Sequence, residues 1–420
     1  MISSGSMTKV QTEQIVTCSC CGSRRSTMFF CLPELPVHVG NFFDDAASAR
    51  QVPRGNVELA YCHHCGHIFN RAFDPGLMDY RPGYEVALHH SPMFRDYMHS
   101  VAQRLIDQYQ LHGKTIVEIG SGGAWFLALL CGWGGNIGIG IDPTTRHPCV
   151  YECDGFRMEL IRDRFGRHLR AKFAEWLPDF VCCLSVLEHI SKPRGLVRDL
   201  RSIVGSRTPT IYFEIFNAFR AFQRQEIWSV NYEQCQYFSE QSFLHLFSSS
   251  AFQILESGCS YGTDQYLYVD CVPDSGPCTL HRAGQLEPAN RNSHHTPHET
   301  TDLPVEISQF NTRFHERCRV WEHRFRQYRQ QGKRVVFWGT GGKGVTFLNA
   351  CPSASLIEIV AEINPDKHGK FVPGSAQRIV APEDLVAYRP DVLIVSNALY
   401  EQEVRQQAAS LGLRCEFHVA

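Results

Sequence analysis

Two cysteine pairs near the beginning of this 420-residue sequence have the spacing of metal ligands. Cys18-x-x-Cys21 and Cys62-x-x-Cys65 are each followed by glycine, which lets the chain turn back so that backbone amides point toward thiolate sulfur. Four thiolates complete the tetrahedral coordination of Zn²⁺ and leave no open position for a substrate. The sequence therefore predicts a structural zinc site at Cys18, Cys21, Cys62 and Cys65.

Other side chains compete for this site. The candidate ligands beside the two pairs are Cys20, His63, His64 and His67. The 40 residues between Cys21 and Cys62 exceed the roughly 15–20 of a minimal zinc ribbon, so we expect an insertion in this module. Most of the 18 cysteines are expected to be reduced and to act as small apolar side chains.

A glycine-rich turn follows a short apolar strand in the first half of the chain. The strand is predicted at 115–119, the turn is Gly120-Ser121-Gly122-Gly123, and a helix begins at Trp125. Such a sequence of elements begins a doubly wound α/β domain, and its glycines let a ligand approach the positive helix N-terminus. A second predicted strand, 137–141, ends at Asp142, whose carboxylate can bind ribose hydroxyls. This segment therefore has the pattern of a nucleoside-binding domain.

A second turn of this kind lies in the last quarter of the chain. The strand predicted at 334–338 leads into Gly339-Thr340-Gly341-Gly342-Lys343-Gly344, which fits the dinucleotide-binding spacing G-x-G-x-x-G. Glu362 follows the next predicted strand, where an acid that binds ribose would lie. A nicotinamide site is one interpretation, and a glycine turn that only permits tight strand–helix packing is another.

The elements that position these residues are expected to form two or three domains, given the length of the chain. A polar stretch, 74–92, has the composition of a connector, in which Tyr80 and Tyr84 either cover a substrate or only pack. The predicted parts are a zinc-binding domain (12–75), a core (76–272), a linker rich in Pro, Gly, Ser and His (273–304) and a second Rossmann-like domain (305–420).

The charge balance narrows the class of protein. Lys and Arg number 41 against 43 Asp and Glu, and this balance excludes a broadly basic nucleic-acid binder. No apolar run reaches the roughly 18–20 residues that span a bilayer, and Met1–Val10 lacks the apolar core of a signal peptide. We therefore expect a cytoplasmic protein with a small-molecule partner and with no nucleic-acid or membrane partner.

Several details sharpen the interpretation of the central domain. Glu118 lies inside the first strand, Asp142 ends the second, and a strand at 180–185 leads into Leu187-Glu188-His189. Together with the compact glycine turn, this pattern resembles the class I S-adenosylmethionine-dependent methyltransferases. The resemblance implies a Rossmann-like methyltransferase core with S-adenosylmethionine as cofactor. By it, the cofactor-binding residues are Glu118, Gly120, Ser121, Gly122, Gly123, Asp142, Leu184 and Ser185, and Leu187 lines the same cleft.

The C-terminal segment has two further features. The turn 364–374 reads Asn-Pro-x-Lys-x-Gly-x-x-x-Pro-Gly, and a strand predicted at 391–396 ends before Asn397. Both resemble the C-terminal domain of the sugar C-methyltransferases, which combine a zinc-binding N-terminal domain, a methyltransferase core and a Rossmann-like C-terminal domain. This resemblance implies a nucleotide-diphosphate-linked keto-deoxysugar as substrate. It also implies a phosphate or nucleotide site, in place of a redox site, at Gly339, Gly341, Lys343 and Gly344.

The Tyr-x-Glu-His signature of that family is only partly matched. Glu233 matches the acid, but Gln234 stands where the histidine would be. Asn231 occupies the tyrosine position, and Tyr232 is adjacent. Glutamine is not a base at neutral pH. Either His189, which matches a second family histidine, acts as the base with support from Glu233 or Tyr232, or the acceptor is not an enolisable carbon. The predicted catalytic residues are thus His189, Glu233 and Tyr232.

The sequence as a whole predicts an S-adenosylmethionine-dependent methyltransferase that C-methylates a nucleotide-activated deoxysugar or a related small metabolite. An O- or N-methyltransferase on the same scaffold is the first alternative. An NAD-dependent oxidoreductase that uses the 339–344 turn, and a non-catalytic zinc-binding protein, are the others. The sequence predicts neither the acceptor atom nor the oligomeric state.

Overall fold

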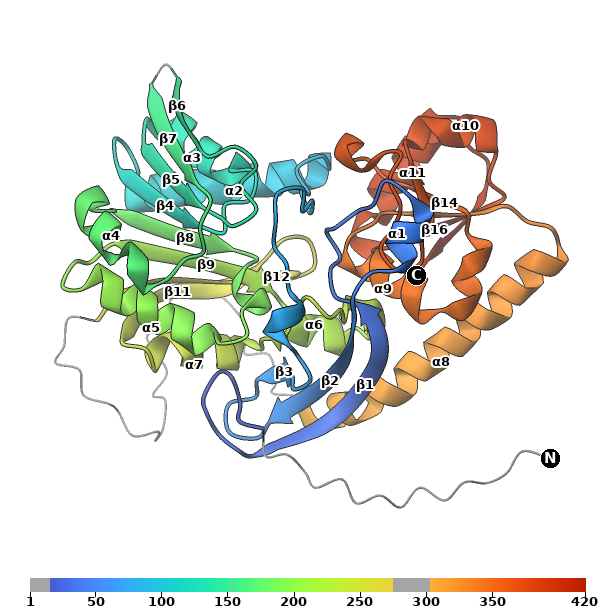
Figure 1. The fold of residues 1–420 in the computed structure, drawn as a ribbon, viewed down its shortest axis with the longest axis horizontal. Coiled ribbons are helices and arrows are strands. Elements are labelled where there is room, and N and C mark those ends of the chain that lie inside the picture. The colour runs from blue at the N-terminus through green and yellow to red at the C-terminus, as the bar shows by residue number, and fades with distance from the viewer. Residues whose placement is uncertain (1–15, 154, 275–302) are drawn as a thin grey trace.

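Three β-sheets follow one another along the chain in this computed structural model, which describes residues 16–153, 155–274 and 303–420 (Figure 1). Their strand orders are β1-β2-β3-β10, β11-β12-β9-β8-β4-β5-β7-β6 and β15-β14-β13-β16-β17. No helix of these residues is both long and apolar enough to cross a membrane. The predicted linker contains four histidines that lie outside the described residues: His281, His294, His295 and His298.

The N-terminal module is a small antiparallel sheet. β10, which comes from the core segment, pairs with β3 through Gln236–Phe69 and Tyr237–Ile68. The module is therefore larger than the predicted range 12–75, because a strand from far along the chain closes its sheet. Its elements are β1 (Ser26–Pro36), α1 (Ala46–Arg50), β2 (Arg54–Cys62), β3 (Ile68–Asn70) and β10 (Gln236–Tyr237).

The central sheet is doubly wound around β4, which pairs in parallel with β5 on one side and β8 on the other. Ligands of such sheets bind beyond the carboxyl ends of the strands at this switch point. The turns after β4 and β8 meet there. The strands are β4 (Thr115–Ile119), β5 (Ile137–Ile141), β6 (Cys149–Cys153), β7 (Phe156–Ile161), β8 (Phe180–Leu184), β9 (Thr210–Phe216), β11 (Phe252–Ser260) and β12 (Tyr266–Pro273).

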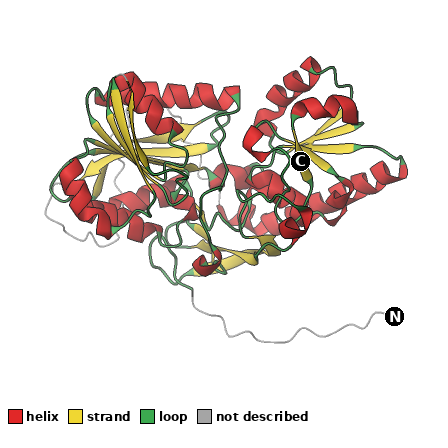
Figure 2. Cartoon of the chain, turned by 45° about the horizontal axis from the view of Figure 1, so that its top comes forward, coloured by secondary structure: helices red, strands yellow, loops and turns green. Residues whose placement is uncertain are grey.

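Helices cover both faces of this sheet (Figure 2). α2 (Pro92–Tyr109) and α3 (Trp125–Gly134) pack on one face. Ser91 caps α2, because its hydroxyl accepts a hydrogen bond from the backbone N–H of Phe94. α2 ends at Tyr109, since Gln110 adopts a left-handed conformation. The other face carries α4 (Arg170–Trp176), α5 (Pro193–Val204) and α7 (Glu240–Ser248).

The C-terminal sheet is parallel throughout and confirms a second Rossmann-like domain. Its switch point lies between β13 and β16, because β13 pairs with β14 on one side and with β16 on the other. α8 and α9 cover one face, and α11 covers the other. The elements are α8 (Leu303–Gln330), β13 (Val335–Trp338), α9 (Gly342–Ala350), β14 (Ile359–Ala361), β15 (Arg378–Val380), α10 (Leu385–Tyr388), β16 (Val392–Val395), α11 (Glu401–Ser410) and β17 (Glu416–Val419).

Helix α8 joins the N-terminal sheet to the C-terminal domain (Figure 1). Phe310 and Phe314 of α8 pack edge-on against Phe30 of β1, with ring centroids 5.0 Å apart in each pair. Farther along α8, Trp321 packs against Phe347 of α9 with the centroids 5.1 Å apart. All of these rings belong to one buried cluster. The first and last modules of the chain therefore form one packed unit.

The C-terminal domain also contacts the central domain directly. Tyr261 donates a hydrogen bond to Tyr400 over 2.9 Å, and the Ser91 hydroxyl donates to Glu403 over 2.8 Å. These contacts fix the position of the C-terminal switch point relative to the core. The remaining short elements are η1 (Pro75–Leu77), η2 (Arg167–Leu169), η3 (Leu187–His189), α6 (Ala218–Gln223), η4 (Ile227–Ser229), η5 (Pro352–Leu356), η6 (Pro365–Lys367), η7 (Pro382–Asp384) and η8 (Ala398–Tyr400).

Candidate functional site

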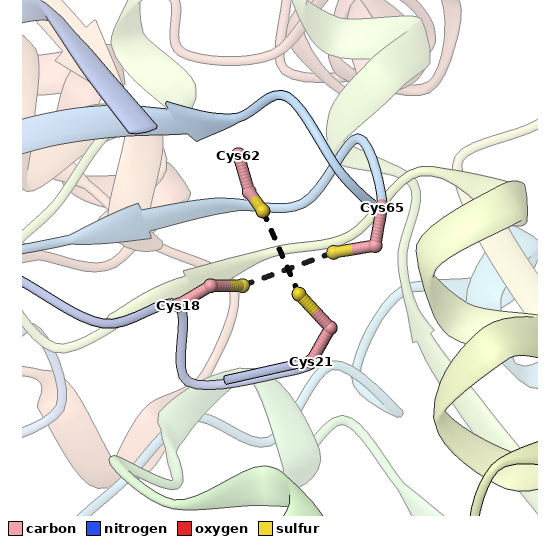
Figure 3. A group of neighbouring side chains, drawn as sticks. All are labelled: Cys18, Cys21, Cys62 and Cys65. Carbon is pink, nitrogen blue, oxygen red and sulfur yellow. Dashed lines mark hydrogen bonds between the residues drawn. The ribbon is translucent and has the colours of Figure 1, made fainter. Parts of the chain in front are cut away.

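The four cysteines of the two CxxC pairs converge at one end of the N-terminal sheet (Figure 3). Their sulfur atoms all lie within 4.8 Å of one another. The Cys18–Cys65 and Cys21–Cys62 sulfur pairs are 3.8 Å and 3.6 Å apart. A tetrahedron of Zn–S bonds of about 2.3 Å has S···S edges of about 3.8 Å. The donor set and its spacing therefore fit a Zn²⁺ ion.

The competing ligands lie elsewhere. Cys20 directs its sulfur to the backbone oxygen of Ser242, 3.4 Å away. His67 hydrogen-bonds to Gln236 over 2.8 Å. The nearby His63 and His64 are also not members of the metal-binding group found among the described residues. The cluster is thus made of the four predicted thiols and none of the alternatives.

The cysteine cluster is packed onto the core. The guanidinium of Arg194 at the start of α5 donates to the backbone oxygen of Cys21 over 3.1 Å. The buried cysteines share one hydrophobic cluster with side chains of α5 and α7. Any ion held by the thiolates would therefore stabilise the interface between the N-terminal module and the core.

The glycine turn after β4 lies at the switch point of the central sheet. Gly120 has a φ of +76°, and a Cβ there would overlap with the side chain of Val186, so only glycine fits. Gly122 and Gly123 differ, because a Cβ at either position would meet no atom within 4 Å. The turn therefore borders open space on the side of the strand ends, as a ligand-binding turn requires.

Acidic and hydroxyl groups surround this space. One oxygen of Asp142 accepts from the Gly122 N–H over 2.9 Å, and the carboxylate is 8% exposed. Glu118 and Ser121 each have a buried side-chain oxygen without a hydrogen-bond partner among the described residues. Open space beside the turn together with such unpartnered oxygens fits a polar nucleoside cofactor such as S-adenosylmethionine.

The predicted residues after β8 lie beside the same turn. Ser185 has a left-handed φ of +53°, and its N–H donates to the Glu214 oxygen over 2.8 Å. Leu184 precedes it at the end of β8, and Leu187 of η3 is completely buried. The structure therefore brings the predicted cofactor residues of β4, β5 and β8 to one edge of the sheet.

A second polar cluster is built around Glu233. This carboxylate is 0% exposed, accepts from the Val39 N–H over 2.8 Å and accepts from the Tyr84 hydroxyl. Burial acts to raise its pKa, but the nearby His38 ring, the charge of His189 and the hydrogen bonds from Tyr84 and Val39 outweigh burial and lower it. Glu233 is therefore an ionised carboxylate held between the N-terminal module and the core.

Sequence reasoning missed His38 in this cluster and left Tyr80 between covering a substrate and packing. Nδ1 of His38 lies 3.9 Å from a Glu233 oxygen, while its Nε2 accepts from the Asp79 N–H over 2.9 Å. The buried Tyr80 hydroxyl has no hydrogen-bond partner among the described residues. Burial, and then the charge of Glu233, raises its pKa, so Tyr80 stays a neutral donor. His38 could not be found from the sequence, because no local spacing links it to Glu233. Tyr80 and Tyr84 could be recognised, because they stand out in the polar connector.

His189 lies between the glycine turn after β4 and the polar cluster around Glu233. It ends η3 directly after β8, beside the cofactor turn, and its Nδ1 lies 3.0 Å from the backbone oxygen of Glu233. Because a carbonyl oxygen only accepts, Nδ1 must carry the proton in the neutral ring. Nε2 then keeps its lone pair, and the described residues contain no partner for it. Asp142 is near enough to contribute, after burial and Glu233, to the raised pKa of Tyr84.

Tyr232 and Gln234 do not join this cluster. The Tyr232 hydroxyl accepts from the Asp74 N–H over 2.8 Å, and its ring packs against Phe73. Its role is thus to hold the connector in place. The Gln234 amide reaches the backbone oxygen of Gln236 at 3.4 Å, so it stabilises its own loop.

The glycine turn of the C-terminal domain is largely filled by its own side chains. A Cβ on Gly344 would overlap with the backbone oxygen of Gly339, so glycine permits close strand–helix packing there. The Thr340 N–H donates to Glu362 over 3.0 Å, and the buried Lys367 lies 3.6 Å from the same carboxylate. The turn thus already holds an internal anion with its counter-ion.

The other predicted substrate residues of this turn border it. Lys343 pairs with Glu226 of the core and lies 3.2 Å from the Asn397 side-chain oxygen. A Cβ on Gly341 would meet nothing within 4 Å, so the turn is open at that point. Lys343 and Gly342 of the turn both lie against residues of the core.

The sheet topology and the polar groups beside the glycine turn define a class I, Rossmann-like methyltransferase core. Residues 89–257 match a family model described as a methyltransferase domain. Residues 298–416 match a second model, described as the C-methyltransferase C-terminal domain. The protein is an S-adenosylmethionine-dependent methyltransferase that carries this C-terminal domain.

Solved structures similar to this chain include several methyltransferases. Magnesium protoporphyrin IX methyltransferase from Synechocystis, with bound S-adenosylhomocysteine, is 14% identical, and the match covers 45% of this chain and 89% of that chain (TM-score 0.34). An S-adenosylmethionine-dependent methyltransferase from Aquifex aeolicus is 10% identical, with 44% and 94% covered (TM-score 0.28). Among curated proteins, no sequence matches the chain.

We expect S-adenosylmethionine to bind more tightly as the pH rises from 7 to 9. Burial, and then the charge of Asp142, raises the pKa of Glu118 to about 8, so its carboxyl is mostly protonated at pH 7. A cationic cofactor favours the ionised form, so below pH 8 the affinity gains up to about tenfold per pH unit. Calorimetric titration of the wild type and Glu118→Gln at pH 7, 8 and 9 measures this. An equal pH dependence in both proteins would contradict it.

Proposed function

We propose that the protein transfers a methyl group from S-adenosylmethionine to a carbon atom of a nucleotide-activated deoxysugar or a related small metabolite. The observation that carries the proposal is the Nδ1 contact of His189 with the Glu233 backbone oxygen. In the neutral ring this contact places the proton on Nδ1, so Nε2 is the nitrogen that can accept a proton. Imidazole is well suited to remove a proton near neutral pH.

Methylation of a carbon beside a ketone needs a base and a group that stabilises the enolate. Nε2 of His189 takes the proton, and the Tyr80 hydroxyl, which is a neutral donor, stabilises the enolate oxygen. S-adenosylmethionine supplies the electrophilic methyl group. A C–C bond forms as the S–CH₃ bond breaks, and the proton remains on the imidazole. The buried carboxylate of Glu233 then neutralises the imidazolium.

The same arrangement supports a second candidate, O- or N-methylation. Gln234 replaces the family histidine, and its amide is already bonded within its own loop. A heteroatom acceptor would need one base at most, which His189 could supply alone. This candidate predicts that Gln234→His gives no increase in turnover.

The N-terminal cysteine cluster has a structural role in this proposal. Four thiolates fill the coordination sphere of Zn²⁺, so the ion would take no part in the transfer. Its contribution would be to hold the two knuckles of the N-terminal module against α5 and α7 of the core.

Product analysis tests the proposal. The full-length protein is incubated with ¹³C-methyl-labelled S-adenosylmethionine and a panel of nucleotide-linked keto-deoxysugars. We expect one labelled methyl group per product, with ¹³C–¹³C or long-range carbon couplings that place it on carbon. A label attached to oxygen or nitrogen would support the second candidate. Failure to bind S-adenosylhomocysteine in a parallel calorimetric titration would contradict both candidates.

A further inference from the structure

His38 of the N-terminal module brings an unpaired ring nitrogen to the polar cluster around Glu233. Its side chain is 8% exposed, and Nδ1 is buried without a hydrogen-bond partner in the part of the chain that the structure describes. The nearest Glu233 oxygen is 3.9 Å away, which is too far for a hydrogen bond. Buried polar groups of folded proteins nearly always have a partner, so this exception calls for one.

The other nitrogen of the ring determines where its proton lies. Nε2 accepts the backbone N–H of Asp79 over 2.9 Å. Because a nitrogen that accepts a hydrogen bond carries no proton, the imidazole is neutral and its proton is on Nδ1. His38 therefore presents a buried N–H donor to the cluster, and only a hydrogen-bond acceptor can pair with it.

The carboxylate of Glu233 is held at a distance from this donor. One of its oxygens accepts from the Tyr84 hydroxyl, and the other accepts from the Val39 N–H over 2.8 Å. Val39 follows His38 directly, so the loop that carries the imidazole also fixes the carboxylate. The gap between Nδ1 and the nearer carboxylate oxygen is thus set by the same loop.

Tyr80 of the connector brings a second buried donor to the same region. Its ring packs edge-on against the His38 ring, with the centroids 5.4 Å apart. Its hydroxyl has no hydrogen-bond partner among the residues that the structure describes. Burial, and then the charge of Glu233, raises the pKa of Tyr80 well above its ordinary value, so the hydroxyl keeps its proton. Two neutral donors from different modules thus lack an acceptor.

We propose that the Nδ1–H group of His38 and the hydroxyl of Tyr80 together bind the ketone oxygen of the methyl acceptor and stabilise the enolate formed from it. The inference rests on the proposed function, in which Tyr80 already has this role. His38 is then a further catalytic residue, which the N-terminal module contributes to the site. Two fixed donors that bind one developing oxyanion stabilise the transition state without having to reorganise.

Protons and electrons balance in this arrangement. Nε2 of His189 takes the proton from the carbon beside the ketone, and the electron pair of that C–H bond passes into the enolate. Imidazolium and enolate therefore form together, and the net charge of the site does not change. The enolate pair then makes the C–C bond, while the pair of the S–CH₃ bond stays on sulfur. His38 and Tyr80 donate hydrogen bonds throughout and keep their protons.

Two substitutions of His38 separate its two ring nitrogens. In His38→Gln, the amide oxygen can replace Nε2 as the acceptor for the Asp79 N–H, but nothing replaces the Nδ1–H donor. In His38→Asn, the amide N–H replaces that donor, and the Asp79 N–H loses its acceptor. Glutamine is therefore the better replacement if His38 only holds the connector, and asparagine is the better one if His38 binds the substrate oxygen.

The measurement uses the full-length protein with ¹³C-methyl-labelled S-adenosylmethionine and the panel of nucleotide-linked keto-deoxysugars. We expect kcat to fall about 10²- to 10³-fold in His38→Gln, the usual effect of removing one donor to an oxyanion, while KM changes less than about threefold. In His38→Asn, kcat should stay within about tenfold of the wild type. The affinity for S-adenosylhomocysteine should be unchanged in both variants, which also shows that they are folded.

A double-mutant cycle with Tyr80→Phe tests whether the two donors share one oxygen. Groups that bind the same atom are coupled, so His38→Gln combined with Tyr80→Phe should lower kcat by less than the product of the two single effects. Effects that multiply in full would overturn the shared oxygen. This cycle does not require the asparagine variant.

The possible failures are distinguishable. Equal rates in His38→Gln and His38→Asn, or a faster rate in His38→Gln, would overturn the inference while carbon methylation still holds. A methyl label on oxygen or nitrogen would overturn it as well, because no enolate would form. If the wild type methylates no member of the panel or does not bind S-adenosylhomocysteine, the proposed function is wrong and the inference falls with it. A selective loss of kcat in His38→Gln supports the inference.

Discussion

Substituting Cys62→Ser is expected to release the metal and to lower the unfolding midpoint of the whole protein by at least about 5 °C. Four-thiolate sites bind zinc with an apparent free energy of about 10–16 kcal/mol in small domains, so the loss of one thiolate should affect folding strongly. The effect should extend beyond the N-terminal sheet, because the cysteines share a buried cluster with α5 and α7. Elemental analysis of the dialysed protein should give one zinc per wild-type chain.

Cys20→Ser is the matched control for this prediction. Cys20 lies next to Cys21, is as buried as Cys62, donates to the Ser242 oxygen and is not one of the four grouped cysteines. This variant should keep its zinc and most of its stability. Wild-type protein without zinc, or equal metal loss in Cys20→Ser and Cys62→Ser, would contradict the assignment of the four ligands.

The elements around the cofactor turn could be predicted from the sequence because their signals are local. Apolar runs bounded by glycines fix β4 and β5 at the limits found in the structure. The metal ligands were also accessible, since each knuckle needs only a three-residue spacing and a glycine. In both cases each motif lies within a single turn and the strand next to it, so its spacing is visible in the sequence.

The cluster around Glu233 could be predicted only in part, because it is assembled from distant segments. His38 follows β1, Tyr84 belongs to the connector, and the two meet at Glu233 only after the N-terminal module docks on the core. Tyr232 was predicted to support His189 because it lies next to Asn231, which occupies the tyrosine position of the family signature. In the structure the Tyr232 hydroxyl faces the Asp74 backbone instead.

Substituting His189→Asn is expected to lower the rate of methyl transfer by about 10²- to 10⁴-fold, which is the usual contribution of a general base. Asparagine can still donate a hydrogen bond to the Glu233 backbone oxygen, in place of Nδ1, but it has no basic nitrogen in place of Nε2. The loop and the affinity for S-adenosylhomocysteine should therefore change little. The rate is measured with the sugar nucleotide that the product analysis identifies.

Proton exchange separates a base from a residue that only shapes the site. In deuterium oxide, with S-adenosylhomocysteine bound in place of the methyl donor, the wild type should exchange the proton beside the acceptor's ketone for deuterium. His189→Asn should lose this exchange, while Gln234→Ala should keep it, because the Gln234 amide contacts only its own loop. Exchange that survives in His189→Asn would assign proton removal to another group. His38 would not be that group, because its Nε2 already accepts the Asp79 N–H. The Glu233 carboxylate, 3.9 Å from Nδ1 of His38, would be the next candidate base.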